Sequence, residues 1–288
     1  MVSYVDWSKA KTILIFAFII TNILLGFVLL SSERQVETTT KEGFIEDVTE
    51  ILKSKNIFID TNISREIPSL STLIVEYDFV DFTKVNNNFF QGNGTIESKE
   101  QNTAEIFFEN ESIIVTNKKN LVYENKKTTK EYKDLDEEKA KDIALEFLQE
   151  RKYDTSDMVL SYISLKEDGY YLEFSKLYKD RYLEKSSTII ELDETGVKRM
   201  ERTWLNILEE RDTPIYISTA PKSILSLLSM KEVYGKTIKD ISLCYYFEPT
   251  DHNDYMKDPK EAKKGKTMPA WRVLFDDGYK VIIDNYNN

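Results

Sequence analysis

A single uncharged stretch near the N-terminus constrains this chain more than any other feature. Residues 12–30, TILIFAFIITNILLGFVLL, carry no charged side chain. As a helix this stretch would be about 28 Å long, close to the roughly 30 Å hydrocarbon core of a bilayer. A cleaved signal peptide would have a shorter apolar region and a small-x-small cleavage site, whereas here Ser31-Ser32 follows two leucines. We therefore predict an uncleaved transmembrane anchor over residues 12–30.

The charges that flank this stretch predict its orientation. Lys9 and Lys11 precede it, while Glu33 and Arg34 cancel one another just after it. Because positive charge favours the cytoplasmic side, residues 1–11 are expected to stay in the cytoplasm. The polar residues 31–40 then form a stalk, and the bulk of the chain lies outside the cell. The predicted localisation is the cell membrane, single-pass, with an extracytoplasmic domain.

The rest of the chain carries the periodic patterns of an α+β fold. Helical spacing predicts a helix over 41–56 and a second one capped by Asp136. A third is expected between Thr219 and Gly235. Alternating or apolar runs predict strands at 73–77, 105–108, 113–115, 158–165, 170–177, 187–192, 197–208, 241–247, 271–275 and 279–283. This order predicts antiparallel sheets with helices packed on one face, divided into an N-terminal lobe, 41–134, and a C-terminal lobe, 135–288.

Composition excludes several classes of function. The 288 residues contain 39 Lys and Arg against 50 Asp and Glu, a net charge of −11, which disfavours nucleic acid as a partner. One cysteine excludes an internal disulfide framework and sites that need two or more cysteine ligands. One histidine excludes two-histidine metal sites and leaves few routes to a Ser-His-Asp triad.

The remaining reactive residues form no catalytic set. His252 lies between Asp251 and Asp254, a candidate cation site, but so polar a loop is more often simply solvated. Cys244 is expected to be a small buried residue of a strand, since no cation is next to it in sequence. Acidic pairs are inevitable among fifty carboxylates. We predict no catalytic residue, no metal site and no cofactor.

Both ends of the chain resemble a known family. The opening run Asp6-Trp-Ser-Lys-Ala-Lys-Thr-Ile-Leu-Ile-Phe-Ala-Phe18, continued by Asn22-Ile-Leu-Leu25, resembles the start of YycI proteins. The closing Pro269-Ala-Trp-Arg-Val273, a glycine turn and Val281-Ile-Ile-Asp-Asn285 are similar to that family's last hairpin. Between these ends the likeness is one of plan. The chain also has Met1–Val5 ahead of Asp6, where family members begin almost directly.

The resemblance implies a role without a reaction. YycI proteins are membrane-anchored accessory regulators of the WalK–WalR (YycG–YycF) two-component system of Gram-positive bacteria, and act with YycH on the sensor kinase that controls cell-wall metabolism. It therefore implies a non-enzymatic regulator whose partners are a WalK-like histidine kinase and a YycH-like protein. A homodimer remains open. The alternatives are an extracytoplasmic enzyme and a lipid- or wall-polymer-binding module, for which the basic stretch 257–266 is a candidate surface.

Partner recognition is predicted to lie partly inside the membrane. Steps of four and three residues place five positions along one side of the predicted anchor: Ile15, Ile19, Asn22, Gly26 and Leu29. An amide in hydrocarbon favours a hydrogen-bonding partner, and a glycine one turn away allows another helix to approach closely. Thr21 lies off this seam and can bond to its own helix.

Overall fold

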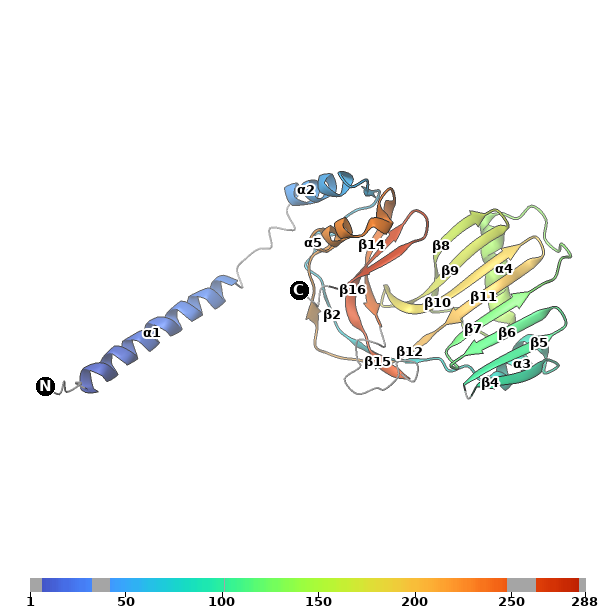
Figure 1. The fold of residues 1–288 in the computed structure, drawn as a ribbon, viewed down its shortest axis with the longest axis horizontal. Coiled ribbons are helices and arrows are strands. Elements are labelled where there is room, and N and C mark those ends of the chain that lie inside the picture. The colour runs from blue at the N-terminus through green and yellow to red at the C-terminus, as the bar shows by residue number, and fades with distance from the viewer. Residues whose placement is uncertain (1–6, 33–41, 101, 248–262, 285–288) are drawn as a thin grey trace.

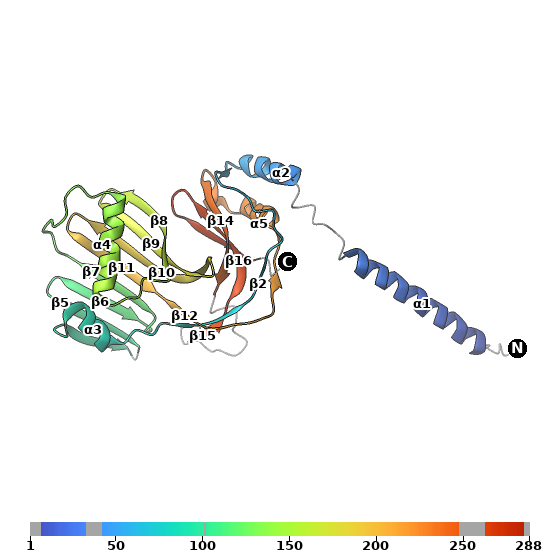
Figure 2. The same cartoon turned by 180° about the vertical axis from the view of Figure 1, so that it is seen from behind.

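The computed structural model of the chain describes residues 7–32, 42–100, 102–247 and 263–284. It begins with helix α1 (Trp7–Ser32), which stands apart from the sheets in Figures 1 and 2. The side chains of α1 are described over residues 11–26. Within the described residues, no helix is both long enough and apolar enough to cross a bilayer. The anchor over 12–30 therefore stays a prediction.

The two clearest helices of the sequence form where their patterns indicate. Helix α2 (Glu42–Lys53) buries Val48 and Leu52, one turn apart on its apolar side. Helix α4 (Glu137–Glu150) begins at Asp136, whose carboxylate accepts a hydrogen bond from the backbone N–H of Lys139 at 2.8 Å. Because this bond satisfies one of the free N–H groups of the first turn, it fixes where the helix starts.

Most strands belong to one large mixed sheet of twelve strands. Its main path runs β17-β16-β14-β10-β11-β7-β6-β5-β4, with β9 and β8 continuing from β10 and β1 beside β14. Its strands are β1 (Phe58–Ile59), β4 (Thr95–Glu100), β5 (Thr103–Phe108), β6 (Glu111–Thr116), β7 (Asn120–Asn125), β8 (Met158–Lys166), β9 (Gly169–Tyr178), β10 (Arg181–Asp193), β11 (Gly196–Thr203), β14 (Thr237–Tyr246), β16 (Met268–Phe275) and β17 (Lys280–Ile283).

Two small sheets complete the fold. One has the order β12-β3-β15 and the other pairs β13 with β2. Their strands are β2 (Ser69–Leu70), β3 (Leu73–Tyr77), β12 (Leu205–Glu210), β13 (Ile215–Tyr216) and β15 (Lys264–Lys266). The predicted α+β class is confirmed. Most pairings are antiparallel, but β14 pairs in parallel with both β1 and β10, so the large sheet is mixed.

Strand β10 lies in the middle of the large sheet and connects the part that contains β14 to the part that contains β11. Its first residues, Tyr182 and Leu183, pair with β14, whereas Ser187 and the residues after it pair with β11. Between them the register shifts, and Lys185 has a φ of 69°. A bulge of this kind bends a strand and increases its twist. The bulge therefore lets one strand change partners.

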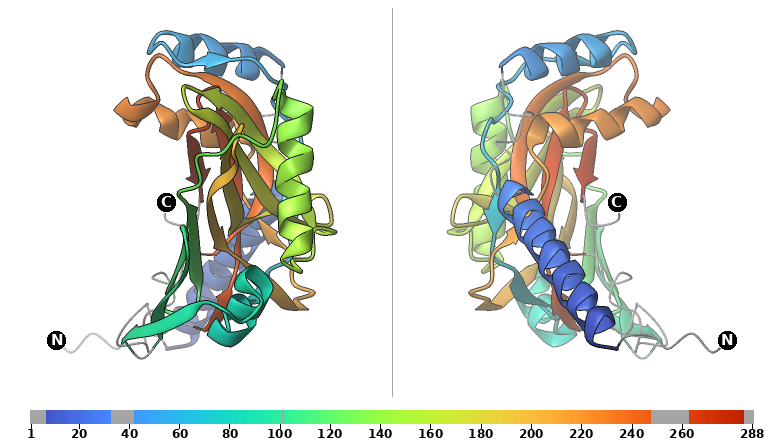
Figure 3. Two further views of the ribbon diagram at one scale, coloured as in Figure 1. Left: turned by 90° about the vertical axis from the view of Figure 1, so that its right-hand side faces the viewer. Right: turned by 90° about the vertical axis from the view of Figure 1, so that its left-hand side faces the viewer.

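Buried side chains gather in two large clusters that flank this strand. The first packs α3 (Phe82–Phe90) and α4 on β5 to β11, and the second packs α2, α5 (Ala220–Ile224) and the η2 turn (Leu225–Ser229) on β14, β16 and β17. Figure 3 shows α3 and α4 on one side of the sheets and α5 on the other. Each cluster contains residues from before and from after residue 134. The division into two lobes at that residue stays a prediction.

Three segments differ from their sequence expectation. Helix α3 was not expected, because its Asn86-Asn87-Asn88 run is a poor helix former. The helix expected from Thr219 to Gly235 is broken into α5, η2 and a further single turn, η3 (Lys231–Val233). The strand expected over 197–208 is two strands, β11 and β12, separated at Trp204. That break lies beside the cavity described next.

Candidate functional site

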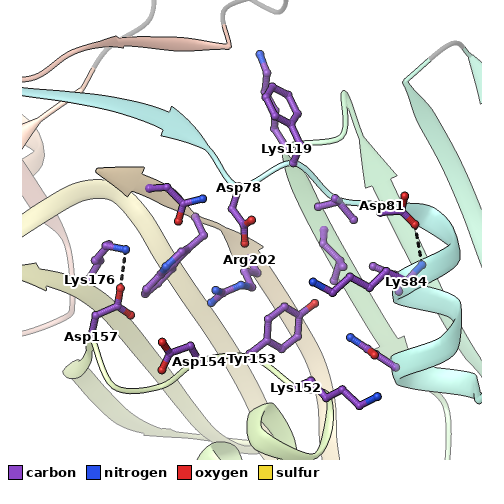
Figure 4. Close-up of a pocket in the computed structure, with 17 residues that line it drawn as sticks. Asp78, Asp81, Lys84, Lys119, Lys152, Tyr153, Asp154, Asp157, Lys176 and Arg202 are labelled. Atoms are coloured by element: carbon purple, nitrogen blue, oxygen red, sulfur yellow. Dashed lines mark hydrogen bonds and ion pairs between the residues drawn. The ribbon is translucent and has the colours of Figure 1, made fainter. Parts of the chain in front are cut away.

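A cavity of about 210 Å³ lies beside the first core cluster, where five stretches of chain meet. Its walls come from the segment after β3 with helix α3, the start of β7 and the turn before it, the loop that joins α4 to β8, the end of β9, and the junction of β11 and β12. Figure 4 shows its side chains, among them the charged Asp78, Lys84, Lys176 and Arg202 and the ring of Tyr153. These residues are far apart in sequence and meet only in the fold.

Arg202 forms the inner part of the cavity wall and is only 6% exposed. It lies on β11 between two other buried residues, Met200 and Trp204, which share its side of the chain because side chains alternate along a strand. Its Nη1 donates a hydrogen bond to the Thr188 hydroxyl at 2.6 Å. Its guanidinium carbon lies 4.2 Å from the centre of the Trp204 ring and 4.6 Å from that of Tyr153.

The surroundings of Arg202 are mostly apolar and aromatic. Burial lowers the pKa of Arg202, which nevertheless stays protonated because free arginine titrates above about pH 12. Burial also raises the pKa of Tyr153 to about 12, while the positive charge of Arg202 opposes that rise. Tyr153 is therefore a neutral hydroxyl at physiological pH, and Arg202 is a cation held against two rings.

Three of the four aspartates that line the cavity are engaged within the protein. Asp157 pairs with Lys176 at 2.5 Å. Asp81 caps α3 by accepting a hydrogen bond from the backbone N–H of Lys84 at 2.8 Å. Asp154 accepts one from the backbone N–H of Ser156 at 2.9 Å, and this bond lowers the pKa of its carboxyl. These carboxylates hold the loops that form the cavity.

The remaining charges face the cavity or its rim. Figure 4 shows the side chains of Asp78 and Lys84 pointing toward Arg202, whereas Lys152 lies at the rim. Among the described residues, no carboxylate lies within the 4.0 Å ion-pair distance of Arg202, Lys84 or Lys152. The cavity therefore carries unpaired positive charge on a chain that is strongly acidic as a whole.

A second buried arginine lies on the other face of the sheet. Arg272 on β16 is 0% exposed. Its Nε is 2.9 Å from Glu184 and its Nη1 is 2.9 Å from Asp240. The contact with Glu184 has the distance of an ion pair without the geometry of a hydrogen bond, so we treat it as electrostatic. Lys280 joins the group by pairing with Glu173 and lying 3.7 Å from Glu184.

The residues singled out from the sequence lie elsewhere. Ile15, Ile19, Asn22, Gly26 and Leu29 all belong to α1, and nothing in the structure tests them as a binding seam. Ile15 and Ile19 are exposed, and a Cβ added at Gly26 would meet no atom within 4 Å. Thr21 donates to the Ala17 carbonyl at 2.8 Å, which confirms the bond expected within its own helix.

The other reactive residues are separate from the cavity. Cys244 is a free, fully buried thiol whose pKa is raised by that burial, as expected for a packing residue. His252 lies outside the described residues. So does most of the basic stretch 257–266, of which Lys264–Lys266 forms strand β15 beside β3. No group of three His, Cys, Asp or Glu side chains that could hold a metal ion occurs among the described residues.

Comparisons with known proteins bear on the fold alone. The sequence matches no protein-family model and no curated protein. An uncharacterised protein from Eubacterium rectale is similar in structure with a TM-score of 0.51 and 13% identity, over 84% of this chain and 94% of that one. At this identity the likeness shows a shared fold alone.

Two further solved structures are similar to this chain. YycH from Bacillus subtilis has a TM-score of 0.49 and 11% identity, and the match covers 78% of this chain and 56% of YycH. The C-terminal domain of Bacillus megaterium YpeB has a TM-score of 0.36 and 12% identity, over 72% of this chain and 99% of that domain.

Proposed function

We propose that this protein is a membrane-anchored, non-enzymatic accessory regulator of a sensor histidine kinase that controls cell-wall metabolism. The resemblance of Asp6–Phe18 and of the closing hairpin to YycI proteins supports this role and supplies the kinase and a YycH-like protein as partners. The uncharged stretch 12–30 and its flanking lysines support a single anchor with an extracytoplasmic domain.

The chemistry of the cavity is the structural observation that carries the non-enzymatic part of the proposal. General acid–base catalysis needs a titratable group free to exchange protons with a substrate near the working pH. In this cavity Asp81, Asp154 and Asp157 hold backbone or lysine partners, and Tyr153 has a pKa raised to about 12. Asp78 is the one aspartate of the lining left free among the described residues, so no second free carboxylate lies beside it as an acid–base pair would need. A cation held against aromatic rings is an arrangement for binding.

Helix α1 supplies the contact that we propose inside the membrane. Ile15, Ile19, Asn22, Gly26 and Leu29 follow one side of this helix and would face a helix of the kinase or of the YycH-like protein. Gly26 allows close approach of a backbone, and the Asn22 amide can bond across the interface. A homodimer would use the same seam.

Co-purification of the kinase complex from intact membranes tests this proposal. Interhelical hydrogen bonds contribute about 0.6 kcal/mol on average, so Asn22→Leu should weaken capture of the kinase about threefold. Gly26→Ile should weaken it more, because a branched side chain keeps the helices apart. Leu24→Ile is the matched control, since position 24 lies about two and a half turns beyond Ile15, on the opposite side of the helix.

The co-purification and two further assays separate the proposal from its two alternatives. If both seam variants capture the kinase and the YycH-like protein at wild-type levels, the seam is not the interface. If the full-length protein captures neither partner, the regulatory role is wrong. Turnover of a cell-wall substrate by the purified protein would favour the enzyme, and sedimentation with isolated wall polymer would favour the polymer-binding module.

A further inference from the structure

We propose that the cavity around Arg202 binds a small ligand through a carboxylate or phosphate group, with Arg202 as the principal contact. This inference goes beyond the proposed regulatory function and does not depend on it. Nothing in the resemblance to YycI proteins or in the comparisons assigns a ligand to these residues.

The first observation is that no carboxylate among the described residues lies within ion-pair distance of the buried Arg202, although Asp78 and Asp157 act on it electrostatically from further away. Burying a charge is costly unless it is paired or well hydrogen-bonded. A guanidinium has five N–H donors, and the Thr188 hydroxyl accepts from only one nitrogen of Arg202. The rings of Trp204 and Tyr153 offset part of the cost by cation–π attraction. The donors that Thr188 leaves unused belong to a side chain that lines an open cavity.

The second observation is that Arg202 is held in place before any ligand binds. The bond to Thr188 fixes one nitrogen, and the two rings lie against the guanidinium. A planar guanidinium held in this way matches the two oxygens of a carboxylate or phosphate group. Because less side-chain freedom is lost on binding, each bond to the ligand contributes more.

The third observation is the sign of the charge around the part of the cavity that opens to solvent. Lys84 and Asp78 both point toward Arg202 in Figure 4. Asp157 also acts on Arg202 electrostatically, but it is already paired with Lys176, so the described residues place two unpaired cations and one unpaired carboxylate around the same space. Asp78 is exposed, so water and salt screen its repulsion of an anion, whereas Arg202 is almost fully enclosed. The balance favours an anionic ligand, and Asp78 is the group that limits its affinity.

The size of the cavity limits the ligand. A volume of about 210 Å³ is below the roughly 300–1,000 Å³ of pockets that hold drug-sized molecules. A small dicarboxylate or a phosphate group fits this space, while a folded segment of another protein does not. Sodium succinate and inorganic phosphate are therefore suitable probes, and succinamide is a neutral molecule of the same shape as succinate.

Calorimetric titration of the full-length protein in detergent tests the proposal. We expect saturable binding of succinate, phosphate or both, and none of succinamide. Arg202→Gln should weaken binding about tenfold or more, as expected for loss of charge-assisted hydrogen bonds. Arg211→Gln is the matched control because it removes the same charge from an exposed position outside the cavity, and it should leave affinity unchanged.

Two further variants keep the test decisive if Arg202→Gln does not fold. Lys84 and Asp78 are exposed, so replacing either should leave the fold intact. Lys84→Gln should weaken anion binding about threefold, and Asp78→Asn should strengthen it by a similar factor. Binding of phosphate alone would assign a phosphate-bearing ligand, and binding of succinate alone a carboxylate.

Either of two results would overturn the proposal. One is the absence of saturable binding by the wild-type protein at concentrations up to about 50 mM, well beyond the millimolar range of weak specific binding. The other is wild-type affinity in a folded Arg202→Gln variant, or in each of the two single variants Lys84→Gln and Asp78→Asn measured separately.

Discussion

Arg272 and Arg202 are the two buried arginines among the described residues, and they lie on opposite faces of the large sheet. Arg272 has two carboxylates within 2.9 Å, one of them the nearly buried Glu184. Arg202 has a hydroxyl and two rings. Both also contact an aromatic ring, since Arg272 lies 4.2 Å from the centre of Tyr182. The two arginines therefore differ in that Arg272 has carboxylates within ion-pair distance and Arg202, among the described residues, has none.

This difference separates a structural cation from one that is available for binding. Arg272 links β16 to β10 through Glu184, and Lys280 links β17 to β9 through Glu173, so the charges hold the two parts of the large sheet together. Arg202 has no carboxylate within ion-pair distance in the part of the chain that the structure describes. Substitution of the two arginines by the same residue should therefore have different consequences.

The largest expected effect is that of Arg272→Gln on stability. The substitution leaves Glu184 buried, with only Lys280 at 3.7 Å to offset its charge. Removing one partner of a buried ion pair typically costs 3–5 kcal/mol, and the nearby lysine places this case near the lower end, at about 3 kcal/mol. Chemical denaturation of the full-length variant measures it. A loss below about 1 kcal/mol would mean that the network does not stabilise the junction.

The next effect concerns pH and the ring beneath Arg202. Burial raises the pKa of Tyr153 to about 12, above the value of about 10 for an unfolded tyrosine. The folded protein holds this proton more tightly, so the stabilisation is complete below pH 10 and is lost as pH rises toward 12. Wild type should therefore lose stability relative to Tyr153→Phe over this range, on the order of 2 kcal/mol.

The comparison of these two proteins removes the contributions of the other tyrosines and lysines, which both share. Denaturation curves at pH 9, 10 and 11, roughly spanning the unfolded pKa, should show about 1.3 kcal/mol of this loss. A constant difference between wild type and Tyr153→Phe across these values would show that Tyr153 titrates normally and that the environment of Arg202 is more open to water than described.

The smallest effect is that of Arg202→Gln on stability. No buried carboxylate loses its partner, so the cost is limited to one hydrogen bond to Thr188 and the contacts with Trp204 and Tyr153. These losses are partly offset because a buried charge no longer has to be desolvated. We expect a change of about 1 kcal/mol or less by denaturation. A loss equal to that of Arg272→Gln would erase the distinction between the two arginines.

Local patterns predicted much of the fold. Asp136 and the apolar spacing after it located α4, and the alternation of residues 158–177 located β8 and β9. Helix α3 was missed because its asparagines outweighed two signals that were present, the cap at Asp81 and the buried Val85 and Phe90. The parallel pairing of β10 with β14 was beyond prediction, since it depends on a bulge and on distant chain segments.

The cavity could not be predicted as a whole, because its walls come from residues spread between 78 and 206. One part of it was visible in the sequence. Met200, Arg202 and Trp204 alternate, and a charged residue between two apolar ones on the same face of a strand is unusual enough to indicate a buried cation. The sequence pattern does not show whether such a cation has a carboxylate partner. For Arg272 the carboxylates come from other strands. For Arg202 none lies within ion-pair distance among the described residues.

Thermal unfolding with and without the anionic probe tests the central claim most directly, because it compares both arginines in one measurement. A ligand at ten times its dissociation constant stabilises the folded state by about 1.4 kcal/mol, a rise in melting temperature of about 2–4 °C for a domain of this size. We predict that Arg272→Gln begins well below wild type yet rises with succinate or phosphate, whereas Arg202→Gln begins near wild type and does not rise. An Arg202→Gln variant that rises as wild type does would contradict the account.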